Sequence, residues 1–237
     1  MLYMPGLEED ERQHARLCQA YQKGIPCVHG TVTGGKIVEK TSTYSIVQWK
    51  PALSSKKRKI EEMNTTSRNK TIPSQWPLLV QMIANDLGMD ESTALWHLSK
   101  QTVFLYLGID ASNRQKSNNS NNNNRTRILG VATAQSLSQA YRMSSLHNRS
   151  IAPSKAMLGI GVLWTHLAAR HRGIATTLVT AARQYTIFSV TVPKALLAFS
   201  TPTQAGYDFA VTYLYGTGGN DQVNGTTRTR GPLVYEM

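Results

Sequence analysis

The six residues Arg170–Ala175, Arg-His-Arg-Gly-Ile-Ala, constrain the fold of this chain more than any other stretch. They match the pattern Arg-x-x-Gly-x-Ala between an apolar run, Met157–Trp164, and a helix-like stretch, Ala175–Tyr185. This order predicts a strand, a tight turn and a helix. The first N–H groups of a helix have no partner within the helix, and the helix dipole adds partial positive charge there. We therefore expect the turn to bind an anion such as a pyrophosphate.

Three residues of the turn suit this ligand. Arg170 and Arg172 supply positive charge and several N–H donors. Gly173 has no side chain, so phosphates can approach the backbone closely. The six-residue pattern also occurs by chance in many proteins, and its weight comes from the predicted strand before it and the predicted helix after it.

The distribution of charge supports an anionic ligand. The net charge is +12, and residues 111–207 contain eleven lysines and arginines but no aspartate or glutamate. Such a segment suits an anionic cofactor, an acidic partner or nucleic acid, and a merely solvated basic surface fits the charge equally well. Any general base in this segment must be a histidine, a hydroxyl acting through water, or a group from elsewhere in the chain.

Composition excludes several other classes of protein. The 237 residues suffice for one well-buried domain plus an appendage. Four acidic residues, Glu8–Glu11, stand where a signal peptide would be basic and then apolar. No uninterrupted apolar run reaches the roughly 20 residues that span a bilayer. The two cysteines, Cys18 and Cys27, are too few for a disulfide framework, so we expect a reducing compartment.

Hydrophobic periodicity and turn residues predict an α+β fold. The predicted helices are Glu8–Lys23, Gln75–Leu87, Ala175–Tyr185 and Ala205–Tyr215. The predicted strands are a pair within 31–50 joined by a turn at Thr33–Lys36, then Thr102–Leu107, Arg127–Thr133, Met157–Trp164, Ala198–Phe199 and Pro232–Tyr235. Residues Arg149–Lys155 are predicted to form a polar loop.

Two segments lack the composition of a packed core. Residues 51–74 are polar and rich in Ser, Thr and Lys, which predicts a linker. Residues 112–126 are dominated by asparagine, which predicts a disordered insert at the tip of a hairpin. We expect residues 31–237 to form the main domain around these two segments.

The order of the motifs resembles that of a known family. The motifs are Asn85–Gly88, Ile128–Ala132, Leu158–Ile160 followed by Trp164, Arg170–Ala175 and Ala198–Thr203. In this order the chain resembles the cohesin acetyltransferases, which establish sister-chromatid cohesion and form a branch of the GCN5-related N-acetyltransferase superfamily. The resemblance runs from residue 3 to residue 235. It implies the fold of that superfamily, a mixed and mostly antiparallel sheet flanked by helices.

The resemblance also implies acetyl-CoA as the acetyl donor and a set of residues that bind it. Backbone groups of three residues would flank the pantetheine arm: Leu163, Trp164 and Thr165. The turn would hold the phosphates through Arg170, His171, Arg172, Gly173, Ile174, Ala175 and Thr176. The far side of the cofactor would be lined by Thr203, Gln204 and Ala205.

The family's catalytic positions are Gly161, Ser200 and Thr201 in this sequence, and two of them are substituted. Family members commonly have Ile-Ser-Arg-Ile-Trp where this chain has Ile160–Trp164, so the serine proposed to act in catalysis is Gly161 here. Animal members have a catalytic aspartate at position 201, and some fungal members have glutamine. Ser200 is retained, either as a catalytic hydroxyl or as a helix-entry cap. His166 and His171 are the histidines near the turn, and His171 is expected to contact the cofactor.

Residues 1–30 resemble the C-terminal part of the zinc finger that precedes the family's catalytic domain. His14 matches a zinc ligand, and Cys18 lies where the second histidine would be. Positions i and i+4 share one helix face, so both side chains point toward one metal ion. The paired upstream cysteines are absent, and two ligands do not close a structural zinc site. We therefore expect a truncated finger that binds zinc only if those cysteines exist.

Two functions fit these observations, and a third fits less well. The first is an active lysine acetyltransferase whose substrate is the ATPase-head subunit of cohesin. The second is a catalytically weak protein of the same fold that binds acetyl-CoA and acts through interactions. Direct DNA binding suits the charge, but no helix-turn-helix and no complete finger is present. The resemblance implies chromatin association and a nuclear location, for which Lys56–Lys59 is a candidate import signal.

Overall fold

The computed structural model describes most of the chain, namely residues 8–27, 35–50, 76–109, 126–145, 148–216, 220–223, 226–229 and 231–236. The predicted linker and nearly all of the predicted insert lie outside these ranges, as do residues 1–7 of the predicted finger. In the described part of the chain, no helix is both long and apolar enough to cross a membrane.

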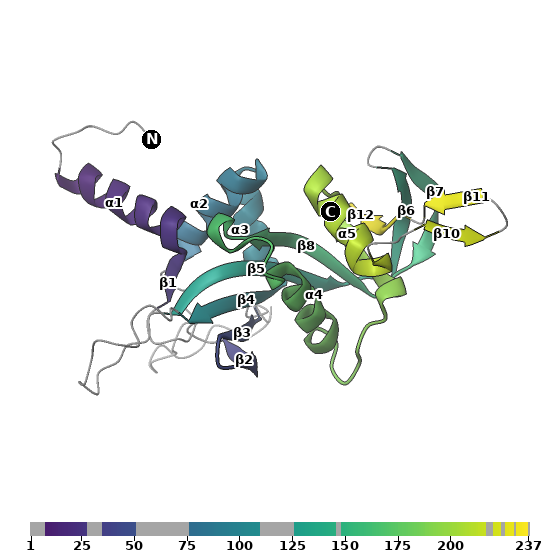
Figure 1. Ribbon diagram of the computed structural model, residues 1–237, viewed down its shortest axis with the longest axis horizontal. Helices are drawn as coiled ribbons and strands as arrows, with labels where there is room; N and C mark the ends of the chain where they lie inside the picture. Colours follow the sequence, from purple (N-terminus) through teal and green to yellow (C-terminus); the bar gives the residue numbers. More distant parts are fainter. Residues whose placement is uncertain are drawn as a thin grey trace, which may run out of the picture.

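In the described residues, ten strands form one sheet in the order β2-β3-β4-β5-β8-β9-β12-β6-β7, with β1 paired to β5 (Figure 1). These strands are β1 (Ile25–Cys27), β2 (Lys36–Lys40), β3 (Tyr44–Trp49), β4 (Thr102–Ile109), β5 (Thr126–Ser136), β6 (Gln139–Ser145), β7 (Asn148–Lys155), β8 (Leu158–Thr165), β9 (Leu197–Ser200) and β12 (Leu233–Tyr235). A separate hairpin pairs β10 (Asn220–Val223) with β11 (Thr226–Thr229). Strand β9 is parallel to β8 and β12, and the other described pairs are antiparallel. The predicted mixed, mostly antiparallel sheet is therefore confirmed.

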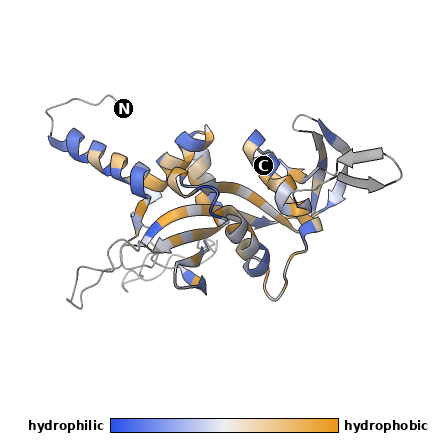
Figure 2. Ribbon diagram, in the orientation of Figure 1, coloured by the Kyte–Doolittle hydropathy of each residue, from blue (hydrophilic) through white to orange (hydrophobic). Residues whose placement is uncertain are grey.

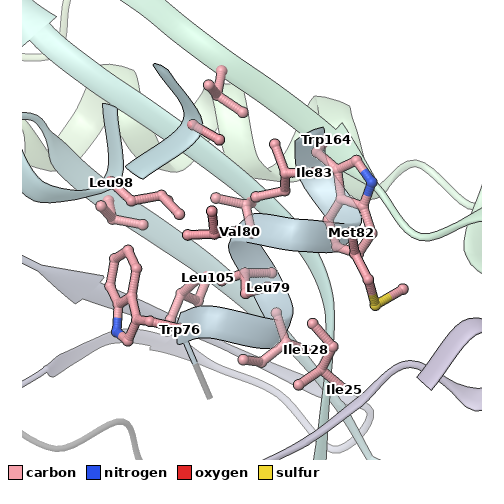
Figure 3. Packing of buried hydrophobic residues seen from close by; sticks show 14 of the residues in the cluster. Ile25, Trp76, Leu79, Val80, Met82, Ile83, Leu98, Leu105, Ile128 and Trp164 are labelled. Carbon is pink, nitrogen blue, oxygen red and sulfur yellow. The ribbon is translucent and has the colours of Figure 1, made fainter. Parts of the chain in front are cut away.

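Helices cover both faces of this sheet. They are α1 (Glu8–Lys23), α2 (Trp76–Leu87), α3 (Glu91–Lys100), α4 (Ile174–Tyr185) and α5 (Gln204–Tyr215). Successive strand residues point to opposite faces. In β4, Val103 and Leu105 join the cluster under α2 and α3, whereas Phe104 joins the cluster under α4. Figure 3 shows the first cluster, in which side chains of α2 lie with Leu105, Ile128 and Trp164.

Hydropathy follows this arrangement. The central strands carry much of the apolar surface, whereas α1 is largely polar and extends away from the sheet (Figure 2). Its C-terminal end is anchored, because Ala20 is fully buried and Ile25 of the following β1 pairs with Ile128 of β5.

Strand β8 has an irregular middle and one edge that pairs only in part. Ala134 of β5 pairs with Ile160 and Ala132 pairs with Leu163, so two residues of β8, Gly161 and Val162, face Thr133 alone. This is a β-bulge, which bends a strand and re-aims its side chains. On the opposite edge, the described pairing of β8 with β9 extends from Leu158 to Ile160 and no further. The two parallel strands therefore diverge at the bulge.

The structure differs from the sequence prediction at several elements; strands β1, β6, β10 and β11, for example, were not predicted. The turn between β2 and β3 lies at residues 41–43, where the Thr41 hydroxyl accepts hydrogen bonds from the backbone N–H groups of Thr43 and Tyr44. Of the predicted turn Thr33–Lys36, the first two residues lie outside the described ranges, and Lys36 begins β2. The predicted loop Arg149–Lys155 is the polar strand β7, which pairs with β6. Helix α3 is absent from the prediction; Asp90 caps it by accepting a hydrogen bond from the Thr93 N–H.

Candidate active site

The predicted strand, turn and helix around Arg170–Ala175 are present. Strand β8 ends at Thr165, a short 3-10 turn covers Leu167–Ala169, and α4 begins at Ile174. His171 and Gly173 adopt left-handed backbone conformations, with φ of 61° and 75°. Glycine adopts this conformation without steric cost. As the N-cap, Gly173 provides no side chain for the first N–H groups of α4, which therefore remain available to an anion.

The other turn residues lie around this helix end. His171, Arg172 and Thr176 are exposed and Ala175 is half-buried, whereas Ile174 is buried and fixes the first turn of α4 to the sheet. Arg170 is directed differently: its Nε donates to the carbonyl oxygen of Thr165 at 3.2 Å, and its guanidinium lies 3.8 Å from Asp86. The turn thus combines an exposed basic surface with a buried anchor.

The end of β8 leads from the bulge to this turn. Leu163, Trp164 and Thr165 pair with β5 on one edge, and on the other edge no described strand pairs with them. The Trp164 side chain is buried, and its indole N–H donates to Asp86 of α2 at 2.8 Å. Burial of this side chain leaves the outer backbone groups of the strand as the surface along the open edge.

The second predicted segment lies next to the first. Ser200 ends β9, and its hydroxyl donates to the carbonyl oxygen of Gly161 at 2.5 Å. Thr201 is exposed, and Thr203 caps α5 by accepting a hydrogen bond from the Gly206 N–H. Because β8 and β9 are parallel, the turns that follow them lie at the same edge of the sheet, the usual place of ligand sites in parallel sheets.

The first turn of α5 completes this segment. Gln204 and Ala205 are exposed, and the Gln204 amide donates to Asp208 one helical turn further on. The structure thus brings the predicted catalytic positions 161 and 200 into direct contact, and it places the turn of α4 and the start of α5 on the strands that carry them.

Helix α3 and the residue that follows it, Gln101, add two side chains that the sequence interpretation missed. His97 is 1% exposed and Gln101 2%, and their Nδ1 and Oε1 atoms are 3.3 Å apart beside Gly161. Burial lowers the pKa of His97, and the hydrogen bond with Gln101 opposes this only in part. The available signal was the cap pattern at Asp90–Thr93 followed by His97 and Gln101 at a helical spacing of four residues.

His166 has a packing role in the structure. It is 1% exposed, its Nε2 donates to the carbonyl oxygen of Ala20 at 2.9 Å, and its Nδ1 accepts from the N–H of Ala168. Both ring nitrogens are therefore engaged with backbone groups, and the ring connects α1 to the segment after β8.

The predicted zinc ligands lie together on α1, apart from this site. The Cys18 sulfur is 3.5 Å from His14 Nε2, and both side chains are exposed. In the described ranges, no group of three or more His, Cys, Asp or Glu side chains is arranged to hold a metal ion. Two ligands do not fit a structural zinc ion, so a zinc-finger remnant is not shown.

Comparisons with known proteins agree with this geometry. A family model described as ESCO1/2 acetyl-transferase matches residues 154–221, which include β8, the turn, α4, β9 and α5. N-acetyltransferase ECO1 of Kluyveromyces lactis is 30% identical over 110 residues, which are 44% of this chain and 41% of that protein. N-acetyltransferase ESCO2 of Danio rerio is 29% identical over 104 residues, 36% of this chain and 17% of that protein. The chain thus spans less than half the length of these relatives.

Solved structures match over most of the chain. The xEco2 acetyltransferase domain bound to a CoA conjugate superposes with a TM-score of 0.57 at 20% identity, covering 85% of this chain and 98% of that one. A second structure of the same domain gives a TM-score of 0.57 at 19% identity, with 87% and 99% covered. These matches establish the fold. The family model, the two relatives and the order of the motifs all show similarity to the cohesin acetyltransferase family.

Proposed function

We propose that this chain is a lysine N-acetyltransferase that transfers the acetyl group of acetyl-CoA to the ATPase-head subunit of cohesin, and so acts in sister-chromatid cohesion. One arrangement supports the proposal most directly. The uncapped N-terminus of α4, the open edge of β8 and the hydroxyl of Ser200 follow one another along β8 and β9, two parallel strands that diverge. The family's relatives named as N-acetyltransferases support it, as does the related domain bound to a CoA conjugate.

The geometry suggests how acetyl-CoA is held. The pyrophosphate would lie on the exposed turn at His171–Gly173, against the N–H groups of α4. The pantetheine amides would bond to the open edge of β8 at Leu163–Thr165, as an added strand does. From there the thioester reaches the bulge at Gly161, where Ser200 also lies. Thr203–Ala205 would line the opposite side.

At the bulge the reaction is a direct transfer. The lysine nitrogen attacks the thioester carbonyl carbon, the new C–N bond forms, and the C–S bond breaks as CoA leaves. The ammonium group must lose two protons in the process: one leaves before attack, and one passes to the CoA sulfur. The protein's contribution is to position the two reactants and to accept the first proton.

A second candidate is a catalytically weak acetyl-CoA-binding protein that acts in cohesin regulation through interactions. The observation that favours it is the chemistry at the two substituted positions: Gly161 has no side chain, and Thr201 is not an acid. Loss of a general base costs roughly a hundredfold to ten-thousandfold in rate, so it reduces activity without abolishing it.

The decisive experiment compares two glycine variants. Gly173→Glu places a carboxylate at the proposed phosphate site, whereas Gly88→Glu introduces the same residue at a similar φ, 66° against 75°, after α2. A Cβ at either position meets no atom within 4 Å, so both variants carry the same kind of backbone strain. We expect Gly173→Glu to lose acetyl-CoA binding by calorimetry and to lose transfer of labelled acetyl to a cohesin head domain. Gly88→Glu should retain both.

The possible results separate the candidates. Binding together with transfer supports the enzyme, and binding without transfer supports the interaction protein. Equal losses in both glycine variants would remove the support for a phosphate site at the turn.

We also propose that the protein acts in the nucleus on chromatin. The support is the basic run Lys56–Lys59 and the family's association with cohesin. A fluorescent fusion with these four residues changed to alanine should no longer accumulate in the nucleus. Nuclear accumulation of that variant would contradict an import role for the run.

A further inference from the structure

The loop between α4 and β9, residues 186–193, exposes an aromatic side chain almost completely. Phe188 is 94% exposed, whereas the other three phenylalanines of the chain are buried or half-buried. Tyr185 and Val190, close to it in the sequence, are 38% exposed each. The loop projects below α4 in Figure 1 and is largely apolar in Figure 2. Single exposed apolar residues are ordinary, but a group of them marks an interaction site.

Both ends of this loop are fixed to the rest of the domain. Val192 is fully buried, its N–H donates to the carbonyl oxygen of Arg183 at 3.0 Å, and the Nε of Arg183 donates back to the Val192 carbonyl at 2.7 Å. Ile187 packs against the core under α4. At the tip, Ser189 has a φ of 57°, a left-handed conformation that is uncommon for residues other than glycine. The loop therefore presents Phe188 from a backbone that is ordered before any partner binds, which lowers the entropy cost of binding.

The charges around the loop are basic. Residues 111–207 contain no carboxylate, and Lys194 directly follows the loop. On the other side lies β2, where the exposed Lys36 pairs with Gln48 of β3. The Gln48 amide donates to the carbonyl oxygen of Tyr185 at 2.7 Å, so Lys36 lies on the sheet face that holds the end of α4. A complementary surface has an apolar pocket bordered by carboxylates.

The loop joins the two elements that carry the proposed site. Helix α4 begins at the proposed phosphate turn, and β9 ends at Ser200. The 12 residues of α4 place the loop about 18 Å from that turn, at a rise of about 1.5 Å per residue. A ligand the size of an amino acid cannot contact both places, whereas a folded protein can. A protein bound at the loop is thus held at a defined distance from the reaction centre.

We propose that this loop docks the protein substrate, with Phe188 entering an apolar pocket that acidic side chains border on the substrate surface. This inference rests on the proposed acetyl transfer. Contacts remote from the reacting lysine restrict transfer to a lysine that a matching folded surface brings to the bulge. Phe188 determines specificity in this way without taking part in the chemistry.

The test compares two acetyl acceptors in steady-state kinetics, a folded cohesin head domain and a short unstructured peptide that contains one lysine. We expect Phe188→Ala to raise the KM for the head domain by about tenfold or more, as truncation of an interface anchor does. The KM for acetyl-CoA, the kcat/KM for the peptide and the Tm should stay unchanged, because this side chain is almost fully exposed. The matched control is Leu95→Ala, which truncates a 42% exposed side chain of α3 on the opposite sheet face and should change none of these values.

A charge reversal tests the basic border of the loop. Lys36→Glu should raise the KM for the head domain and leave the kcat/KM for the peptide unchanged. The difference from wild type should shrink as salt is added, because salt screens charges on exposed surfaces. A wild-type KM for the head domain that does not depend on salt would contradict an acidic partner surface.

The outcomes distinguish this inference from the proposed function. An unchanged KM for the head domain in Phe188→Ala overturns the inference alone, as does a wild-type chain that acetylates the peptide as efficiently as the head domain. If Phe188→Ala instead loses self-association in sedimentation, or loses binding to anionic lipid vesicles, while the KM for the head domain stays unchanged, the loop binds a second copy or a lipid surface and the inference is overturned. A wild-type chain that binds no acetyl-CoA overturns the inference and the proposed function together.

Discussion

The indole N–H of Trp164 donates a 2.8 Å hydrogen bond to the carboxylate of Asp86, and this contact joins the end of β8 to helix α2. The same carboxylate oxygen lies 3.8 Å from the guanidinium of Arg170, the first residue of the turn. A single acid of α2 therefore contacts both the last buried residue of β8 and the start of the turn before α4. The position of the proposed phosphate site is set partly by a helix that lies far earlier in the chain.

Replacing this acid should destabilise the protein and weaken acetyl-CoA binding. Asp86→Ala leaves the part-buried indole N–H of Trp164 without its acceptor, at a cost of about 1–3 kcal/mol in the free energy of unfolding. The half-exposed ion pair with Arg170 adds little to this. Urea denaturation followed by tryptophan fluorescence measures the loss. Glu8→Gln, which removes an exposed carboxylate of α1, should be nearly neutral. Equal stability of both variants would contradict a structural role for Asp86.

A second variant tests the bulge. Thr133→Val keeps the shape of a fully buried side chain but removes the hydroxyl that accepts the hydrogen bond of Val162 N–H. An unsatisfied N–H in this position should cost about 1–3 kcal/mol in the free energy of unfolding. Hydrogen exchange at Val162 measures the local effect, which should exceed that at Trp164, since the latter residue lies in the regular ladder with β5. Unchanged protection at Val162 would show that the hydroxyl does not hold the bulge.

Much of the fold follows from local patterns in the sequence. Apolar periodicity predicts α2 and α4 to within one residue of their observed starts, because each helix buries one regular face. The resemblance to the family assigns Ser200 and Gly161 to one site, and in the structure these two residues are in contact. For the helices, the residues that define the element are neighbours in the sequence.

Tertiary contacts explain what the sequence did not predict. The polar strand β7 has no apolar alternation of its own and forms by pairing with β6 at the edge of the sheet. Helix α3 is short, and its sequence suggests that His97 is a polar surface residue. In the folded chain this side chain is buried. The charge of Arg170 led us to expect that it binds a phosphate. In the structure its side chain instead contacts the carbonyl oxygen of Thr165 and the carboxylate of Asp86, which are not its neighbours in the sequence.

Close packing of α4 on β5 predicts the effect of adding one methyl group at Gly130. A Cβ there would lie 2.6 Å from Ile174 and 2.9 Å from Leu178, both buried side chains of α4. Gly130→Ala should therefore cost about 1–3 kcal/mol in the free energy of unfolding and shift the first turn of α4. Weaker acetyl-CoA binding by calorimetry should accompany the loss.

The matched variant is Gly108→Ala in β4. Its Cβ meets chiefly the half-buried Leu129 side chain, which can change rotamer to relieve the overlap. Gly108→Ala should therefore be milder and leave acetyl-CoA binding intact. Identical binding losses in both variants would contradict a specific coupling of Gly130 to the turn.

The N-terminus of α3 predicts a dependence of stability on pH. The Asp90 carboxylate accepts hydrogen bonds from Ser92 Oγ, from Thr93 Oγ1 at 2.6 Å and from Thr93 N–H at 2.9 Å, which hold the pKa of Asp90 well below its usual range. A carboxyl group whose pKa is lowered by folding stabilises the folded state above its unfolded pKa of about 3.9. That contribution is lost as the pH falls through the lower, folded pKa.

Asp90→Asn isolates this effect, because asparagine also caps helices but does not titrate. Wild type should be more stable than Asp90→Asn at neutral pH, and the difference in unfolding free energy should shrink as the pH falls below about 3.9. Urea denaturation at a series of pH values measures it. Ser92→Ala removes the hydrogen bond that lowers the pKa most, so the effect of Asp90→Asn should be smaller in a chain that already carries Ser92→Ala. An effect of Asp90→Asn that stays constant down to acidic pH would mean that the charge of Asp90 does not stabilise the helix that carries His97.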